Sequence, residues 1–168
     1  DLAKFDNRWS IRIARYFNPI SNHSSGLIKE NPKSIPNNLV PCIIKVAQKK
    51  LTILKVFGKN YKTVDGTGIR DYIHVMDLAD GHVAMIKNNR LKKGLKIYNF
   101  GTGKGSSVLE VIRVFEMNTG ILIPFKFAKR RKGDAAESFC SPKKALKELN
   151  WKSKYDLKQA VMDIKKIL

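Results

Sequence analysis

The stretch DGTGIRDYIHVMDLADGHVAMI, residues 65–86, joins a glycine-rich turn to a short apolar run and then to a helical pattern. Residues 70–75 carry β-branched and aromatic side chains, which are typical of a strand, and Asp77 stands where it can cap the helix that follows. A strand that leads directly into a helix is the building unit of α/β folds. The stretch therefore predicts an α/β fold. Its glycines, arginine and histidines leave open whether it is a phosphate loop, a metal site or a structural turn.

Strand and helix patterns alternate through the rest of the chain. Apolar runs predict strands at residues 9–17, 51–58, 95–101 and 123–131, and amphipathic patterns predict helices at residues 37–50, 106–120, 141–150 and 155–168. The expected helix starts are Asn37 or Asn38, Ser107 with Glu110 as a capping box, Ser141 ahead of Pro142, and Asp156 with Gln159. This alternation supports the α/β architecture.

The composition fits one globular domain. At 168 residues, with 43% hydrophobic and 28% charged residues, the chain can bury a core of ordinary size. It has no apolar run of the ~20 residues that a membrane span needs, and its first residues, DLAKFDNRWS, carry no signal-peptide pattern. Cys42 and Cys140 give neither a disulfide framework nor metal-ligand spacing. We therefore expect no membrane partner, no metal and a reducing, cytoplasmic setting.

The formal net charge of +19 raises the question of nucleic-acid binding. Of the 33 basic residues, 25 are lysines that are scattered through every segment, as in KNNRLKKGLK. They do not alternate with the aromatic side chains on which bases would stack. A lysine-rich composition explains the charge more simply than a nucleic-acid groove, so we do not expect a nucleic-acid partner.

The glycines and histidines of residues 65–86 match neither of two common site types. The glycines do not precede a helix in phosphate-loop spacing, and no Lys-Ser or Lys-Thr follows. His74 and His82 are eight residues apart with no cysteine between them, which argues against a metal site. Arg70, after the glycine turn, could make a forked contact to a phosphate or a surface ion pair near Asp71.

Other polar motifs lie where a strand or helix pattern changes. Asn18 ends the strand at residues 9–17, and ligands of open α/β sheets collect at the carboxyl ends of strands. The helix start at Asn38 offers free N–H groups to an anion. In RRKGD, Arg131 could hold a phosphate while Asp134 accepts hydrogen bonds from ribose hydroxyls. Each motif taken alone is also an ordinary turn or cap.

A second glycine-rich stretch, YNFGTGKGSSV (98–108), lies between a strand and a helix. Its glycines at 101, 103 and 105 do not have the spacing G-x-G-x-x-G of a dinucleotide loop. The stretch therefore predicts a tight structural elbow.

Taken in order and at this spacing, RYFNP, IPNNL, DGTGIRDYIHVMDLADGH, YNFGTGKGSSVLE, RRKGD and ELNW resemble the UDP-glucose 4-epimerases, which are extended short-chain dehydrogenase/reductases. The likeness runs from about residue 1 to the end of the chain. It implies a Rossmann-type fold with a smaller substrate-binding domain. It also implies an isomerase that uses bound NAD to oxidise the hexose C4, rotates the 4-keto sugar and reduces it again. That reaction interconverts UDP-glucose and UDP-galactose in galactose metabolism.

The resemblance assigns residues of this sequence to the two ligands. Those implied for the sugar and diphosphate are Asn18, Asn38, Leu39, Arg70 and Arg131, those for the uridine are Phe57 and Asp134, and the residue beside the hexose is Ser138. Tyr16 is implied to lie near the nicotinamide of NAD. His74 and His82 are then structural rather than catalytic.

Two motifs of the family are absent from this sequence, namely the G-x-x-G-x-x-G loop and the Tyr-x-x-x-Lys pair that moves the proton. DLAKFDNRWS resembles the stretch just after that lysine. We therefore expect residues 1–168 to be the C-terminal half of the enzyme, inactive alone, with the NAD-binding half absent. The helices of the homodimer expected for the full-length enzyme would lie in that other half.

Two further positions bear on specificity. Lys55 stands where the family usually has a small apolar residue beside the uracil. Ser138 stands where relatives have either a bulky aromatic or a small residue, so we expect room for an N-acetyl group on the sugar. Two alternatives stay open: another nucleotide-sugar enzyme of this class, such as a dehydratase, or a basic nucleic-acid-binding module.

Overall fold

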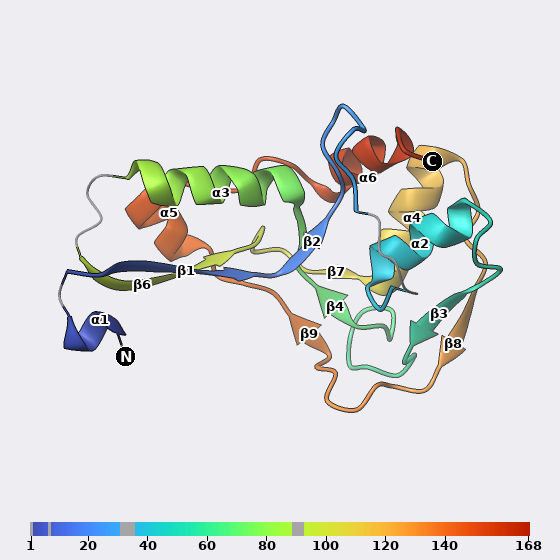
Figure 1. Cartoon of the computed structure of the whole chain (residues 1–168). Helices are drawn as coiled ribbons and strands as arrows, with labels where there is room; N and C mark the ends of the chain where they lie inside the picture. The colour runs from blue at the N-terminus through green and yellow to red at the C-terminus, as the bar shows by residue number, and fades with distance from the viewer. Residues whose placement is uncertain (1, 7, 31–35, 89–92) are drawn as a thin grey trace.

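Two seven-residue parallel strands form one end of the molecule (Figure 1). In this computed structural model, which describes residues 2–6, 8–30, 36–88 and 93–168, β1 (Ser10–Tyr16) pairs with β6 (Gly94–Phe100). The register runs from Ser10 opposite Gly94 to Tyr16 opposite Phe100. Helices α3 (Val75–Lys87) and α5 (Lys143–Leu149) pack on one face of this pair.

The other described strands form shorter groups at the opposite end. They are β2 (Asn18–Ile20) with β5 (Tyr72–His74), β3 (Leu54–Phe57) with β8 (Phe125–Ala128), and β4 (Ile69–Arg70) between β7 (Ser106–Ser107) and β9 (Glu137–Ser138). The remaining helices are α1 (Leu2–Phe5), α2 (Leu39–Ala47), α4 (Val108–Thr119) and α6 (Leu157–Lys165). Strands and helices alternate along the described chain, which confirms the predicted α/β class.

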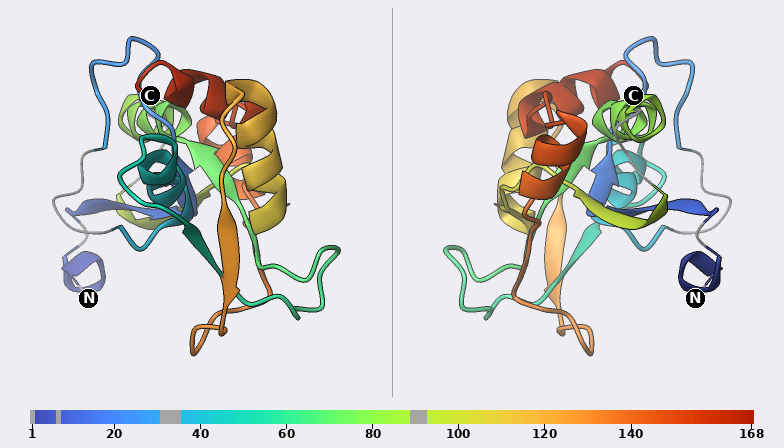
Figure 2. Two further views of the ribbon diagram at one scale, coloured as in Figure 1. Left: turned by 90° about the vertical axis from the view of Figure 1, so that its right-hand side faces the viewer. Right: turned by 90° about the vertical axis from the view of Figure 1, so that its left-hand side faces the viewer.

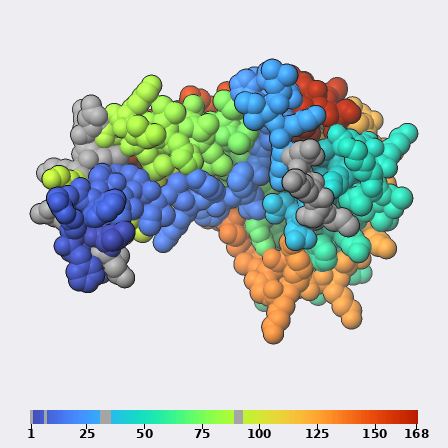
Figure 3. Space-filling view, viewed as in Figure 1, coloured from blue at the N-terminus to red at the C-terminus, as the bar shows by residue number. Residues whose placement is uncertain are grey.

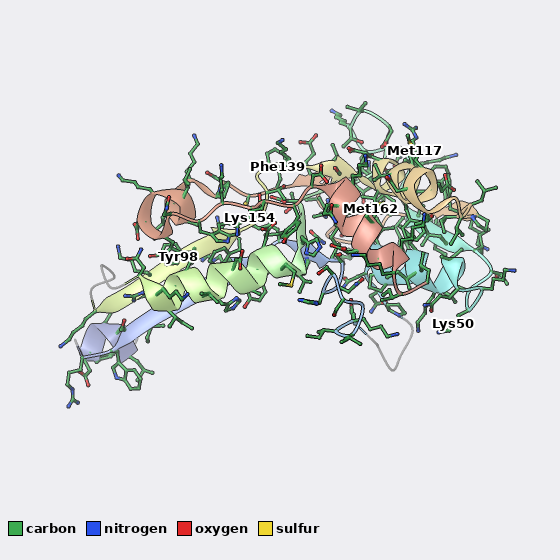
Figure 4. All side chains as sticks on the ribbon, turned by 90° about the horizontal axis from the view of Figure 1, so that it is seen from above. Lys50, Tyr98, Met117, Phe139, Lys154 and Met162 are labelled. Carbon is green, nitrogen blue, oxygen red and sulfur yellow. The ribbon has the colours of Figure 1, made fainter. Side chains whose placement is uncertain are left out.

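The apolar side chains form two cores. The larger one lies between α2, β3, α4 and α6 and includes Ile43, Phe115 and Ile164. The smaller one lies between β6, α3 and α5 and includes Tyr98 and Phe100. Figure 4 labels Tyr98 in the smaller core and Met117 and Met162 on the helices of the larger one. Each fully buried large apolar side chain stabilises the fold by about 1.5–3 kcal/mol.

The capping box at the start of α4 is confirmed. The hydroxyl of Ser107 accepts a hydrogen bond from Glu110 N at 3.0 Å, and the Glu110 carboxylate accepts one from Ser107 N at 3.2 Å. Gly120 ends the helix in the left-handed region at φ 77°. Asp156 caps α6 as predicted, accepting from Gln159 N at 2.8 Å.

The cap predicted for α3 is wrong. Nδ1 of His74 accepts the hydrogen bond of the first turn, from Met76 N at 3.0 Å, and Asp77 lies inside the helix. The buried carboxylate of Asp77 instead accepts hydrogen bonds from the backbone N–H groups of Lys154 and Tyr155 at 2.9 and 3.1 Å. A tertiary contact thus takes the side chain that sequence reasoning assigned to a local cap.

Most other predicted boundaries also differ by one or more residues, as three of them illustrate. Helix α5 begins one residue later than expected, with Pro142 rather than Ser141 at the cap. Strand β3 covers only Leu54–Phe57 of the predicted run 51–58, because residues 51 and 52 bend. The predicted strand 70–75 divides into β4 and β5, which pair with different partners.

One face of the β1–β6 pair carries apolar side chains that face away from α3 and α5. Ala14, Tyr98 and Phe100 point to the helices, so the alternate positions Ile13 and Leu95 point the other way. Both are exposed, at 41% and 48%. The short α1 lies on that side, next to β6 (Figure 2). None of the described helices is long and apolar enough to cross a membrane.

Candidate functional site

A cavity of about 420 Å³ lies between α2, β3 and the segments around β4 and after β8. This volume falls within the range of small-molecule sites in proteins. All nine residues that the sequence analysis assigned to ligands lie in the described part of the chain, and seven of them line this cavity: Asn18, Asn38, Leu39, Phe57, Arg70, Arg131 and Asp134. In Figure 3 the atoms of α2, β3 and the segment after β8 meet on the right-hand part of the molecule.

Strand pairing brings distant parts of the sequence to the cavity. Asn18 begins β2 and lies opposite Tyr72 of β5, while its backbone N–H donates to Asp71 O at 2.8 Å. Arg70 ends β4. Both residues line the cavity, with Asn18 just after the carboxyl end of β1 and at the start of β2.

Charged groups gather at one wall of the cavity. Nε of Arg131 lies 2.9 Å from Oδ2 of Asp134, and Nη2 of Arg70 lies 3.6 Å from Oδ1 of the same carboxylate. The Arg131 guanidinium also lies over the ring of Phe57, with Cζ 4.9 Å from the ring centre. Arg70 is thus paired with Asp134 rather than with Asp71, which was the ion pair considered from the sequence.

The start of α2 forms another part of the wall. Asn38 occupies the cap position with an extended backbone, but its side chain makes no capping hydrogen bond. Asn38 is the residue before the helix, as predicted, but the predicted hydrogen bond from the helix to its side chain is wrong. Asn38 is exposed, and it lines the cavity together with Asn37 and Leu39.

Several lining residues were not predicted. Tyr61 is buried at 6% exposure, and the guanidinium of Arg130 stacks on its ring at 3.8 Å. Tyr72 supplies a second buried ring, and burial raises the pKa of its hydroxyl. The sequence signal for Tyr61 is only its place just ahead of the DGTG turn. Lys55, noted as unusual from the sequence, lines the cavity as well.

Cys42 also lines the cavity but is a poor nucleophile. Its Sγ donates to Pro36 O at 3.0 Å, and burial raises the pKa of the thiol, so it stays protonated at neutral pH. Cys42 and Cys140 are both free thiols. Within the described residues no group of three or more His, Cys, Asp and Glu side chains could hold a metal ion.

Asp71 was not assigned a role from the sequence, yet it organises the glycine-rich elbow. Its fully buried carboxylate accepts hydrogen bonds from Thr102 N at 2.8 Å and Gly103 N at 2.9 Å. A side chain at Gly101 would place its Cβ 2.6 Å from the Asp71 carboxylate and from Cys140 Sγ. The amides that could have held a phosphate are therefore engaged by an internal carboxylate, which confirms the prediction of a structural elbow.

The two remaining predicted residues lie outside the cavity wall. Ser138 is exposed on β9 and stands opposite Arg70 in the strand pairing. Tyr16 is half-exposed at the carboxyl end of β1, with its hydroxyl 2.8 Å from Nε2 of His82. Nδ1 of His82 lies 2.8 Å from Leu78 O and so carries the ring proton. The Tyr16 hydroxyl therefore donates to His82.

His74 is a structural residue, as the sequence analysis expected. It is buried, caps α3, and lies with Nε2 3.3 Å from Oδ2 of Asp163 on α6. Burial lowers the pKa of His74, and the hydrogen bond that Nδ1 accepts from Met76 N likewise favours the neutral ring. The side chain thus ties the end of the strand–helix stretch to the last helix.

Comparison with known proteins places this geometry in a family. The family described as GDP-mannose 4,6 dehydratase matches residues 7–164. The chain is 50% identical over 163 residues to a UDP-glucose 4-epimerase of Bacillus subtilis and 49% identical over 164 residues to one of Cyamopsis tetragonoloba. These matches cover 97% of the chain but 48% and 47% of the relatives, so the chain spans about half the length of the curated relatives it matches.

A solved structure agrees with these matches. The UDP-glucose 4-epimerase from Bifidobacterium longum, in complex with NAD+ and UDP, superimposes with a TM-score of 0.95 at 46% identity. The superposition covers 99% of this chain and 50% of that one. The chain therefore belongs to the nucleotide-sugar family described as GDP-mannose 4,6 dehydratase, within the extended short-chain dehydrogenase/reductases, and UDP-glucose 4-epimerases are its relatives there.

Proposed function

We propose that this chain supplies the UDP-sugar-binding part of a UDP-glucose 4-epimerase. The observation that carries the proposal is the meeting of Arg70, Arg131, Asp134 and Phe57 in one cavity whose remaining wall is largely apolar. Two guanidinium groups offer forked hydrogen bonds to a diphosphate. A carboxylate can accept hydrogen bonds from ribose hydroxyls, and an aromatic ring can cover a base.

The parts of such a ligand can be assigned to parts of the cavity. Arg70 and Arg131 contact the diphosphate, and the exposed N–H groups at the start of α2 beside Asn38 add to its binding. Phe57 and the strand β3 cover the uracil, while Asp134 accepts from the ribose. Asn18, at the strand end, is left for the sugar or the phosphate next to it. Ser138, opposite Arg70 in the strand pairing, is the residue that we propose beside the hexose.

The proposed reaction of the full-length enzyme is the interconversion of UDP-glucose and UDP-galactose, as part of galactose metabolism. NAD, when bound, supplies the hydride acceptor and donor for C4 of the hexose. The residues of this chain do not fit the whole cofactor. The one glycine-rich strand-to-helix turn in the described part has its Thr102 and Gly103 amides engaged by Asp71, which leaves Tyr16 as the contact that we propose for the nicotinamide.

We further propose that the chain corresponds to the C-terminal half of that enzyme. The support is the resemblance of its motifs, in order, and the apolar face of the β1–β6 pair. All-parallel sheets are buried on both faces in known folds, whereas Ile13 and Leu95 are exposed here. The NAD-binding half of the enzyme would cover this face. The proton-moving Tyr-x-x-x-Lys pair would belong to that half, so the chain alone should not epimerise UDP-galactose.

Two statements about the full-length protein rest on the resemblance. We propose a homodimer that forms through helices of the other half. We also propose a reducing, cytoplasmic setting, which the free thiols of Cys42 and Cys140 support.

Titration calorimetry of the purified chain with UDP, uridine and a single-stranded oligonucleotide tests the proposal. We expect UDP to bind, uridine to bind more weakly because it lacks the diphosphate, and UDP-galactose to compete with UDP. No UDP binding, together with tight and strongly salt-dependent oligonucleotide binding that UDP does not displace, would instead establish the basic nucleic-acid-binding module.

The family's own description favours a second candidate function, a nucleotide-sugar dehydratase. The two reactions differ in their products. An assay of the full-length enzyme that yields a deoxy-keto sugar from a nucleotide-hexose would replace epimerisation by dehydration, whereas recovery of the C4 epimer supports the main proposal.

A further inference from the structure

We infer that Asp134 is a specificity-determining residue that selects nucleoside diphosphates against bare inorganic anions. The inference rests on the proposed function of the cavity and deepens it. It concerns how the Asp134 charge acts on an anion that binds Arg70 and Arg131, and why this effect differs between a bare anion and a nucleotide.

Asp134 is the single carboxylate among the described residues that line the cavity. The same wall carries the cationic side chains of Lys55, Arg70 and Arg131. A nearby arginine, Arg130, is directed elsewhere: it stacks on Tyr61 and donates to Asn60 O. In a chain of net charge +19, such a wall would attract any small polyanion if no negative charge stood within it.

The Asp134 carboxylate contacts both arginines that an anion would need. One oxygen lies 2.9 Å from Arg131 Nε and the other 3.6 Å from Arg70 Nη2. The side chains of Arg70 and Asp134 are largely shielded from water, with 20% and 26% exposed. Arg131 is more open, with 51% of its side chain exposed. Screening by solvent is therefore weaker between Arg70 and Asp134 than at the open surface, and an entering diphosphate meets the carboxylate charge as well as the two guanidinium charges.

The backbone keeps Asp134 beside Arg131. The two residues belong to one tight turn, in which Asp134 N donates to Arg131 O at 3.3 Å and Gly133 adopts a φ of 83°. Only glycine adopts such a φ without strain, so the turn is defined by the sequence RRKGD. Because this turn holds the two residues together, an anion that binds Arg131 stays close to the Asp134 carboxylate and does not displace that carboxylate into solvent.

Two kinds of ligand respond differently to this arrangement. Inorganic pyrophosphate gains the arginine contacts but is repelled by the carboxylate, and it has nothing to offer that carboxylate in return. A nucleoside diphosphate also brings two vicinal ribose hydroxyls, and hydroxyl donors to a carboxylate form strong, charge-assisted hydrogen bonds. The carboxylate therefore lowers the affinity for the bare anion and raises it for the nucleotide.

Calorimetry with inorganic pyrophosphate and with UDP, at low ionic strength, tests the inference on the purified chain. Asp134→Asn removes the charge and keeps the shape. We expect it to bind pyrophosphate roughly tenfold more tightly than the unmodified chain and UDP no more tightly, so that the preference for UDP falls at least tenfold. Asp134→Glu, which keeps the charge, should retain weak pyrophosphate binding.

Asp80→Asn is the matched control, because Asp80 lies on α3 outside the cavity lining, pairs with Lys154, and changes the net charge equally when replaced. It should leave both affinities unchanged. Weaker pyrophosphate binding by Asp134→Asn would overturn the inference, because the carboxylate would then serve only to hold the arginines in place. The pyrophosphate comparison does not depend on UDP binding, so absence of UDP binding by the unmodified chain would count against the proposed function separately.

Discussion

The carboxylate of Asp71 accepts a hydrogen bond from the backbone N–H of Gly103, at 2.9 Å and across 32 positions of sequence. The same carboxylate accepts from Cys140 N at 3.2 Å, on the segment that leads from β9 to α5. Asp71 directly follows Arg70, so one buried anion connects the strand that carries Arg70 with the elbow and with the segment that follows Ser138. The position of the candidate diphosphate contact therefore depends on a residue that does not line the cavity.

Replacing Asp71 should destabilise the fold. Asp71→Ala removes a fully buried acceptor and leaves the N–H groups of Thr102, Gly103 and Cys140 without it, so we expect a loss of about 3 kcal/mol or more in the free energy of unfolding. Urea denaturation of the purified chain measures the change. The half-exposed Asp80 pairs with Lys154, and Asp80→Ala, which breaks this ion pair, should change the free energy of unfolding by less than about 1 kcal/mol. Equal effects of the two variants would contradict the role of Asp71.

Removing the Arg70 guanidinium should weaken UDP binding. Arg70→Ala deletes one of the two forked donors at the cavity wall, and we expect the Kd for UDP to rise roughly 10- to 100-fold. The uridine affinity should change much less, because uridine has no diphosphate. Arg8→Ala is the control: Arg8 is 83% exposed, pairs with Asp6, does not line the cavity and changes the net charge equally. An unchanged Kd in Arg70→Ala would remove Arg70 from the site.

A methyl group at Gly81 should destabilise the smaller core. Alanine is favoured over glycine inside a helix by about 1 kcal/mol, which taken alone predicts a more stable α3. The added Cβ, however, would lie 2.6 Å from Cε1 of Phe100, a fully buried ring in edge-to-face contact with Trp151. Overpacking of this kind typically costs about 1–3 kcal/mol. We therefore expect Gly81→Ala to lower the Tm. A raised Tm would show that Phe100 can move aside without a loss of packing in the smaller core.

The His74 ring should make stability fall as the pH is lowered below neutrality. Because the pKa of His74 is lowered in the fold from its ordinary value of 6.5, the unfolded chain takes up a proton before the native chain does. The free energy of unfolding should therefore decline between about pH 7 and pH 5. His74→Asn keeps an acceptor for Met76 N but does not titrate, so its decline over this interval should be shallower.

The comparison of the two chains removes the contributions of groups that His74 does not influence. Burial raises the pKa of Asp77 above its ordinary value of 3.8, so that group contributes stability at low pH that is lost as the pH rises through its native pKa. His74 also lowers the pKa of Asp77 and of Asp163, so the difference between the chains contains this coupling as well as the ring proton. Parallel curves for the unmodified chain and His74→Asn would mean that the ring proton is not linked to folding.

Ser138 should determine whether an N-acetylated sugar is accepted. Its small, exposed side chain stands opposite Arg70, so we expect UDP-N-acetylglucosamine to bind about as well as UDP-glucose. Ser138→Tyr should weaken binding of the N-acetylated ligand selectively, and Ser138→Thr, which adds only a methyl group, should preserve it. If Ser138→Tyr affects the two ligands equally, the side chain is not the one that sets the space beside the hexose.

Much of the local structure was predictable because its signals are local. The Ser107–Glu110 capping box, Gly120 at the end of α4 and the Asp156 cap each satisfy backbone groups within a few residues, so the sequence pattern contains both partners. The prediction failed at Asp77, which is equally suited to a cap. Its carboxylate bonds to the backbone of residues 154 and 155, and no local pattern reveals such a partner.

The sequence by itself determined the α/β class, the elbow and the nature of the candidate site residues, since these depend on periodicity, helix caps and the chemistry of single side chains. The tertiary structure decided which of those residues meet. Asp134 lies near Arg131 in the chain, but Arg70 reaches the same carboxylate because the pairing of β4 with β9 brings together segments that are far apart in the sequence. The tertiary structure also made Asp71 the residue that connects these segments. A buried carboxylate is stable only where the fold surrounds it with hydrogen-bond donors, and the donors to Asp71 come from two other segments.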